Sequence, residues 1–178
     1  MGILERLFPK KEILIDPINP GLLINDIHSH LIPGIDDGSP EMETTISLLE
    51  KFIELGYQKV ITTPHIMSDY YKNTPEIIHR GLEDVKNEIE KRNLKIAIEA
   101  AAEYNLEPEF EKLVANKNIL TFGKEQYVLF ELSFFDEPPR INEVIWQMRE
   151  KGYCPVLAHV ERYAYWHQDQ DKIEEMIN

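Results

Sequence analysis

Short apolar runs alternate with longer amphipathic segments along the chain from residue 22 onward. Alternation of this kind is typical of repeated βα units and a parallel sheet. Most of the runs are rich in β-branched or aromatic residues, which favour strands. Strands are predicted over residues 22–27, 59–63, 95–101, 126–132 and 153–158. The pattern therefore predicts an α/β fold with about five βα units.

The segments between these strands carry signals for the start and end of helices. Ser39 precedes a proline and two acidic residues, so we expect it to cap a helix that ends at Gly56. Thr74 repeats this opening, and an apolar stripe predicts a helix from there to about Arg92. Further helices are predicted over residues 108–115 and 139–151 and from about residue 170.

Residues 1–21 show no sustained apolar period, so we interpret them as an N-terminal extension ahead of one domain over residues 22–178. The formal net charge of −13 argues against a nucleic-acid or anionic-membrane partner. Cys154 is the only cysteine, which excludes an internal disulfide and fits a reducing compartment. Because no apolar run approaches the roughly 18 residues of a membrane span, we expect a cytoplasmic protein without membrane insertion.

Side chains that can bind a metal recur where the predicted strands end. The spacing is 37 residues from His28 to His65, 38 from there to Glu103, and 28 each to Glu131 and then to His159. Each spacing is the length of one βα unit, and a barrel or a wound sheet brings the ends of its strands to one rim. The sequence therefore predicts a metal site at that rim.

The histidines and the aspartate among the candidates each have a simpler interpretation. His28 and His30 point to one side of an extended chain, as two ligands of one ion require, or they are two surface histidines. His65 follows Pro64 into a loop, where a lone histidine is usually structural. Asp37 belongs either to an acidic turn or, beside the two histidines, to the ligand set.

The two candidate glutamates differ in their surroundings. Glu103 follows three alanines, whose small side chains leave room for a bulky group beside the carboxylate. Glu131 lies between Phe130 and Leu132 in an apolar strand, where an unpaired carboxylate is costly to bury. The alternative for each glutamate is a salt bridge. For Glu131 the sequence favours a metal.

An arginine follows the last of the candidate ligands. Arg162 can donate two parallel hydrogen bonds to a phosphate, and the alternative is an ion pair with Glu161 or another acid. An acidic protein that binds an anion needs local positive charge, which favours the phosphate role. Arg140 is a weaker candidate for the same role. Cys154 lacks the Cys-x5-Arg setting of a phosphatase nucleophile, and the sequence has no Gly-rich phosphate loop.

Five segments, taken together, resemble a known superfamily: DIHSHLIPGIDDG, TTPHIMSDYY, AAEYNL, VLFELS and LAHVERY. In this order and spacing they are similar to the polymerase-and-histidinol-phosphatase (PHP) superfamily. The closest resemblance is to the bacterial PHP-type protein-tyrosine phosphatases of capsular and exopolysaccharide systems, the CpsB-like family, over about residues 22–178. It implies a distorted TIM-like (β/α)7 barrel with up to three metal ions, often manganese, at its C-terminal rim. Five of the seven implied βα units are readable here, and the family's later units, with a further Asp-x-His motif, are not within this chain.

The resemblance also implies roles for individual residues. The positions that match metal ligands of the family are His28, His30, Asp37, His65, Glu103, Glu131 and His159. Arg162 matches a position that holds the substrate phosphate. The implied substrate is phosphotyrosine, typically on the tyrosine-rich tail of a bacterial tyrosine kinase that controls polysaccharide export. The nitrogen and oxygen ligands suit manganese, iron or zinc.

Three functions are compatible with these residues. The first is hydrolysis of phosphotyrosine by hydroxide that the metal ions activate, with Arg162 neutralising charge on the transferred group. The second is hydrolysis of a small metabolite such as histidinol phosphate by a PHP phosphatase. The third is a catalytically incomplete domain that binds a phosphotyrosine tail without turnover. A shortened barrel can also borrow strands from a second copy, so a homo-oligomer is one of the arrangements to consider.

Overall fold

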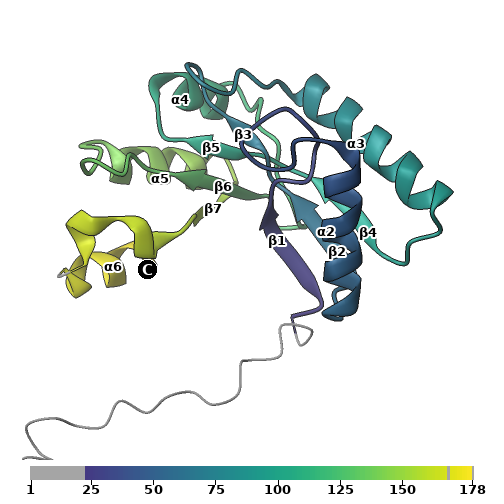
Figure 1. Cartoon of the computed structure of the whole chain (residues 1–178). Helices are drawn as coiled ribbons and strands as arrows, with labels where there is room; N and C mark the ends of the chain where they lie inside the picture. The colour runs from purple at the N-terminus through teal and green to yellow at the C-terminus, as the bar shows by residue number, and fades with distance from the viewer. Residues whose placement is uncertain (1–22, 168, 178) are drawn as a thin grey trace, which may run out of the picture.

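The computed structural model describes residues 23–167 and 169–177, and its centre is a layer of parallel strands (Figure 1). The predicted N-terminal extension over residues 1–21 lies outside the described residues. None of the described helices is both long enough and apolar enough to cross a membrane.

The strands form two short sheets that follow one another along the layer. Their bounds are β1 (Asn25–Ser29), β2 (Lys59–Thr62), β3 (His65–Ile66), β4 (Ala97–Ala100), β5 (Glu103–Asn105), β6 (Tyr127–Glu131) and β7 (Cys154–Leu157). The first sheet has the order β1-β2-β4 and the second has the order β3-β5-β6-β7. Every pair of neighbouring strands is parallel. The predicted α/β class with a parallel sheet is confirmed.

Two of the predicted strands are each followed, after a short break, by a further short strand. Pro64, which has no N–H to donate to a ladder, separates β2 from β3, and Ala101 and Ala102 separate β4 from β5. Hydrogen bonds continue across the break, because the Ala101 N–H donates to the Thr62 oxygen at 2.9 Å and the Glu103 N–H donates to the Pro64 oxygen at 3.1 Å. The two sheets are therefore one curved layer, in the order β1, β2 with β3, β4 with β5, β6 and β7.

The sequence-based prediction of the strands was incomplete in three respects. It missed β3 and β5, which have two and three residues and are too short to show an apolar period. It ended the first strand too early, because β1 continues to Ser29 and contains His28. Finally, β1 and β7 do not pair with each other within the described residues, so the layer does not close into the expected barrel.

Helices connect successive strands and pack against the layer. Their bounds are α2 (Met42–Glu54), α3 (Pro75–Lys91), α4 (Pro108–Ala115), α5 (Ile141–Glu150) and α6 (Gln170–Ile177). Helix α2 packs against α3, and α4 packs against α5, while α3 also contacts β4 and α5 contacts β7 (Figure 1). Two short 3-10 helices follow β7, namely η2 (Val160–Arg162) and η3 (Ala164–Trp166).

The two predicted helix caps differ in outcome. The Thr74 side chain accepts a hydrogen bond from the Ile77 N–H at 3.4 Å, so Thr74 caps α3 as expected. Ser39 does not cap α2, because that helix begins later, with Glu41 at the N-cap position. The Ser39 hydroxyl instead donates to the Glu41 oxygen and accepts a hydrogen bond from the Thr45 hydroxyl, which ties the loop before α2 to the helix.

Apolar side chains are buried on both faces of the strand layer. The larger cluster joins the strands to the helices and includes Val60, Leu49 and Ile78. Because neighbouring residues in a strand point to opposite faces, Ile61 belongs to a smaller cluster on the other face, together with Leu129. Burial on both faces explains why the strands appear in the sequence as continuous apolar runs.

Thr62, at the end of β2, holds the chain on both sides of His30. Its hydroxyl donates a hydrogen bond to the Ser29 oxygen at 2.9 Å and accepts one from the Leu31 N–H at 2.8 Å. Thr62 is fully buried, so both bonds form away from water. The backbone around His30 is thus positioned by a side chain of the neighbouring strand.

Valine has nearly the shape of threonine but no hydroxyl, so Thr62→Val leaves the buried Leu31 N–H without its partner. We expect the free energy of unfolding to fall by about 1–3 kcal/mol, measured by urea denaturation at pH 7. Thr63→Val is the matched control, because the Thr63 hydroxyl is equally buried but has no hydrogen-bond partner among the described residues. Equal losses in the two variants would contradict the role assigned to Thr62.

Candidate metal centre

The carboxylate of Glu103 is the centre of a cluster of histidines. Glu103 is 1% exposed and lies at the start of β5, where its direct partner in the ladder is His65 of β3. Its Oε2 atom lies 3.0 Å from Nε2 of His28 and 3.1 Å from Nε2 of His30. Its Oε1 atom lies 2.8 Å from Nε2 of His159. One buried carboxylate therefore faces three imidazoles that come from opposite ends of the sequence.

A second carboxylate contacts the other ring nitrogen of His30. The Oδ2 atom of Asp36 lies 2.7 Å from Nδ1 of His30, and it also accepts a hydrogen bond from the His65 N–H at 3.0 Å. The other oxygen of Asp36 accepts from the Gly38 N–H at 3.0 Å. A carboxylate in this position fixes the orientation of a metal-binding histidine and leaves the far ring nitrogen free for the ion.

The seven residues predicted as ligands converge on one pocket. Three groups have ligand atoms that all lie within 4.8 Å of one another, namely His28, His30 and Glu103; His30, Asp37 and His65; and His65, Glu103 and Glu131. His159 is outside these groups, but its Nε2 atom lies close to Glu103 and 3.5 Å from Glu131. The groups share members, so the sequence-based expectation of one rim site agrees with the geometry.

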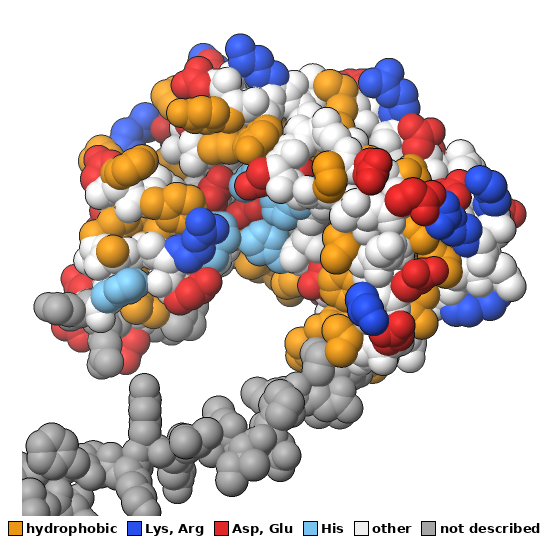
Figure 2. Space-filling model, in the orientation of Figure 1, with side chains coloured by type: hydrophobic (Ala, Val, Ile, Leu, Met, Phe, Trp, Pro, Cys, Tyr) orange, Lys and Arg blue, Asp and Glu red, His pale blue; other side chains and the backbone are white. Residues whose placement is uncertain are grey.

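The pocket has a volume of about 410 Å³ and is open on one side. Figure 2 shows histidine side chains gathered in the hollow of this face, with acidic and basic side chains around them. Beyond the predicted ligands, the pocket is lined by Arg162 and by the aromatic residues Tyr70, Tyr71 and Phe134. It can therefore admit a substrate from solvent and surround it with both charge and aromatic surface.

The buried carboxylates require positive charge nearby. Burial, and after it the charge of Glu103, raises the pKa of Glu131 to about 7. Burial also disfavours charge on Glu103, but hydrogen bonds to the histidines outweigh it and hold the pKa of that carboxyl well below its usual range. Burial lowers the pKa of His30, but hydrogen bonds to Asp36 and Glu103 outweigh it and raise that pKa to about 10. A metal ion bound here replaces these protons, so its affinity rises with pH.

The unpaired atoms in the pocket fit a divalent metal. The Nδ1 atoms of His65 and His159 are buried and have no hydrogen-bond partner among the described residues. Nδ1 of His65 lies 3.6 Å from Glu103 and 3.5 Å from Glu131, which is too long for a hydrogen bond. Ligand atoms that are each about 2.1 Å from one ion lie roughly 3 to 3.5 Å apart, so these distances are suitable for shared coordination. The donor set of nitrogen and oxygen suits a first-row divalent ion.

His159 has an unusual backbone conformation. Its φ of 34° and ψ of 54° are left-handed, which is costly for a residue other than glycine. The turn carries the chain from β7 directly into η2, and it places both His159 and Arg162 at the pocket. Strain of this kind persists where the surrounding structure requires it and is often found at functional sites.

Arg162 is available for an anionic ligand. Its guanidinium lies 4.3 Å from the centre of the Phe134 ring, and no carboxylate of the described residues forms an ion pair with it. The alternative of a pair with Glu161 is therefore not present. Arg140, the weaker candidate, instead forms ion pairs with Glu111 at 3.0 Å and with Glu143 at 2.9 Å, and it does not line the pocket.

Several residues of the site were not identified from the sequence. Of the two adjacent aspartates in the acidic turn, the sequence-based prediction includes Asp37 and assigns no role to Asp36. Tyr71 stacks on His65, with ring centres 5.4 Å apart and an angle of 10° between the planes. The tyrosine pair Tyr70 and Tyr71, five and six residues after His65, was the available signal for an aromatic wall.

Comparison with known proteins identifies the family. The family model described as "Capsular polysaccharide synthesis, CpsB/CapC" matches residues 24–178. This chain belongs to the CpsB/CapC family. The tyrosine-protein phosphatase YwqE of Bacillus subtilis is 28% identical over 137 residues, which are 77% of this chain and 54% of YwqE. The tyrosine-protein phosphatase CpsB of Streptococcus pneumoniae is 30% identical over 156 residues, which are 86% of this chain and 63% of that protein.

A solved structure shows the same fold as this CpsB/CapC chain. It comes from a study of YwqE from Bacillus subtilis and CpsB from Streptococcus pneumoniae, described as metal-dependent tyrosine phosphatases. The match has a TM-score of 0.80 and 25% identity, and it covers 86% of this chain and 62% of the other. The expected membership of the CpsB-like family is confirmed. The chain spans between about half and two thirds of the length of these relatives.

Gly38, in the acidic turn, packs closely against His30. A Cβ atom at this position would lie 2.2 Å from Cβ of His30 and 2.4 Å from the His30 oxygen, closer than real contacts allow. The φ of Gly38 is not in the left-handed region, so the close approach alone requires glycine. The turn can thus lie against His30 only because no side chain intervenes.

Gly38→Ala is expected to push His30 out of position and to weaken Mn2+ binding by about tenfold or more, measured by isothermal titration calorimetry at pH 7.5. Gly152→Ala is the control for a general loss of stability, and we expect it to leave the Mn2+ affinity unchanged. Gly152 has a φ of 90° and open space around its Cα, so alanine there strains the backbone far from the pocket. An unchanged Mn2+ affinity in Gly38→Ala would show that the cluster does not depend on this packing.

Proposed function

We propose that this CpsB/CapC chain hydrolyses phosphotyrosine on a protein in a metal-dependent reaction. The observation that carries the proposal is the convergence of seven nitrogen and oxygen side chains on one open pocket, together with an arginine that forms no ion pair with an acid of the described residues. The names of YwqE and CpsB as tyrosine-protein phosphatases support the same reaction. The strand layer fits part of a distorted (β/α)7 barrel, with the pocket at the carboxyl ends of the strands.

The proposed ligands hold a small cluster of divalent ions. They are His28, His30, Asp37, His65, Glu103, Glu131 and His159. The three overlapping groups provide for up to three ions, for which we propose manganese, with iron or zinc as alternatives that the same ligands suit. Metal ions bound there would act as Lewis acids and would supply hydroxide at neutral pH, because coordination lowers the pKa of water from 15.7 to about 7.

The remaining residues of the pocket act on the substrate. Arg162 donates hydrogen bonds to the phosphate oxygens and balances the charge that develops as phosphorus is attacked in line. The Phe134 ring packs against the guanidinium of Arg162 and limits the orientations that this group can adopt. Asp36 keeps His30 in one orientation throughout.

The family suggests where the natural substrate is to be sought. The family model names capsular polysaccharide synthesis, so we propose a phosphotyrosine protein of that system, the tail of a bacterial tyrosine kinase, as the partner. We propose a cytoplasmic location for this chain, where it would meet such a tail. A homo-oligomer is compatible with the open strand layer.

Hydrolysis of a phosphotyrosine peptide with added Mn2+ tests this function directly. We expect turnover that EDTA abolishes and that excess Mn2+ restores. His65→Ala and Glu131→Gln are each expected to reduce kcat by more than about 100-fold, because loss of a ligand costs more than the roughly 10–100-fold cost of losing a residue behind one. His79→Ala is the control, since His79 is exposed on α3 and far from the pocket residues.

The alternatives give different results in the same assay. A clear preference for histidinol phosphate over the peptide at equal concentration would instead indicate a phosphatase of a small metabolite. Peptide binding without product over several hours, by a protein shown to be folded, would indicate a binding domain that lacks turnover. EDTA-resistant hydrolysis would contradict the metal-dependent reaction itself.

A further inference from the structure

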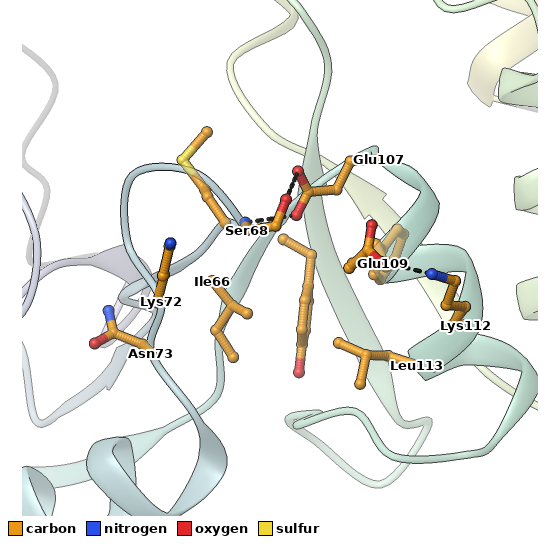
Figure 3. A pocket seen from close by; sticks show the side chains of 11 residues that line it. Ile66, Ser68, Lys72, Asn73, Glu107, Glu109, Lys112 and Leu113 are labelled. Carbon is orange, nitrogen blue, oxygen red and sulfur yellow. Dashed lines mark hydrogen bonds and ion pairs between the residues drawn. The ribbon is translucent and has the colours of Figure 1, made fainter.

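A second cavity lies beside the metal pocket, in the gap between the loop after β3 and helix α4. Its volume is about 330 Å³. Figure 3 shows Ile66, Lys72 and Asn73 on the loop side and Leu113 and Lys112 on the side of α4. Met67 lines both this cavity and the metal pocket, so the two are separated by a single loop. We call this cavity the side pocket.

Apolar residues form the inner wall of the side pocket, and polar residues such as Glu107 and Glu109 also line it. Tyr104 and Phe110 are both 1% exposed and stack on each other with ring centres 5.0 Å apart. Ile66 and Leu113 are half-buried, one on either side of the cavity. A cavity built on core aromatic residues keeps its shape without a ligand, which lowers the cost of binding one.

Hydrogen bonds hold the loop between the two pockets at Ser68 and at Asn73. The N–H and the hydroxyl of Ser68 each donate a hydrogen bond to the carboxylate of Glu107, both at 2.8 Å. The side-chain amide of Asn73 donates to the His65 oxygen at 2.8 Å and to the Ile35 oxygen at 3.0 Å. The distance between the metal pocket and the side pocket is therefore fixed by the loop.

Two lysines at the side pocket differ in their partners. Lys112 forms an ion pair with Glu109 at 2.6 Å. Lys72 is exposed and forms no ion pair with a carboxylate of the described residues. In a chain with a net charge of −13, a lysine without an acidic partner at the edge of an apolar cavity favours an acidic ligand group there.

We propose that the side pocket binds an apolar side chain of the substrate polypeptide, a few residues away from the phosphotyrosine in the metal pocket. An acidic residue of the same polypeptide pairs with Lys72. The proposal rests on the proposed function, because the phosphotyrosine determines where the rest of the substrate lies. A polypeptide that leaves the metal pocket over Met67 reaches the side pocket next. Each residue of an extended polypeptide spans about 3.3 Å, so only a few residues separate the two pockets. The phosphatase thereby selects among phosphotyrosine sites by the residues that flank the phosphotyrosine.

The test uses peptides with phosphonomethyl-phenylalanine, which cannot be hydrolysed, in place of phosphotyrosine. A single leucine is moved through the four positions on either side, in a background of glycine and serine. Binding to the full chain with Mn2+ is followed by fluorescence anisotropy. We expect at least one leucine position to bind five- to tenfold more tightly than the peptide without leucine. An aspartate beside that leucine is expected to add a further two- to threefold.

Two variants assign the effect to the side pocket. Leu113→Gln is expected to remove the preference for leucine, and Lys72→Glu, a change on an exposed loop residue, is expected to reverse the preference for aspartate. Leu48→Gln is the matched control, because Leu48 is a 41% exposed leucine on α2 and does not line the side pocket. The proposal is overturned if no leucine position is preferred, if the preference survives in Leu113→Gln, or if no peptide binds.

Hydrolysis of p-nitrophenyl phosphate distinguishes this proposal from the proposed function. This small ester has no neighbouring residues, so Leu113→Gln is expected to hydrolyse it with unchanged kcat and KM. If the unmodified chain fails to hydrolyse it but still prefers a leucine peptide in a Leu113-dependent way, the proposed activity is wrong and the side pocket stands. If hydrolysis is normal and the leucine preference is absent, the activity stands and the side pocket does not bind substrate.

Discussion

The need for a cation beside two buried carboxylates determines the arrangement of the site. Glu103 is 1% exposed and Glu131 is 4% exposed, and charge on such groups is costly without a positive partner. Histidines surround Glu103, and a proton on His30 or a bound metal ion supplies the charge that the carboxylates require. Much of the surrounding structure keeps these few side chains in place. The strained backbone of His159 and the close packing of Gly38 are the clearest examples.

Breaks in two strands of the parallel layer position two of the proposed ligands. Pro64 ends β2, and the short strand β3 then starts at His65, directly opposite Glu103 of β5. The ends of β1, β6 and β7 and the starts of β3 and β5 thus contribute to one pocket. Four of the proposed ligands, His28, His65, Glu103 and Glu131, therefore lie on strands, while the others follow strand ends or lie in the acidic turn. The loop after β3 brings Tyr70 to the opening of the pocket.

The sequence predicted the repeated features of this protein well. Spacing by whole βα units was enough to place the histidines and glutamates at one rim, because the ends of parallel strands meet there. It did not predict β3 and β5, which are too short to have a period, and it assigned a capping role to Ser39 that the later start of α2 excludes. Asp36 and Thr62 act through contacts with residues that are 6 to 33 positions away in the chain. Such contacts become visible only when the strands are placed side by side.

The most direct measurement of the metal centre is anomalous X-ray diffraction at the manganese edge, from crystals of this chain grown with Mn2+. The structure predicts anomalous peaks within bonding distance of the Glu103 carboxylate, with His28 and His30 as ligands of one ion and His65 and Glu131 at another. Glu103 would then exchange its hydrogen bonds with the histidines for bonds to metal. Peaks only at other positions, or no peaks while Glu103 stays hydrogen-bonded to the histidines, would contradict a metal cluster built around this carboxylate.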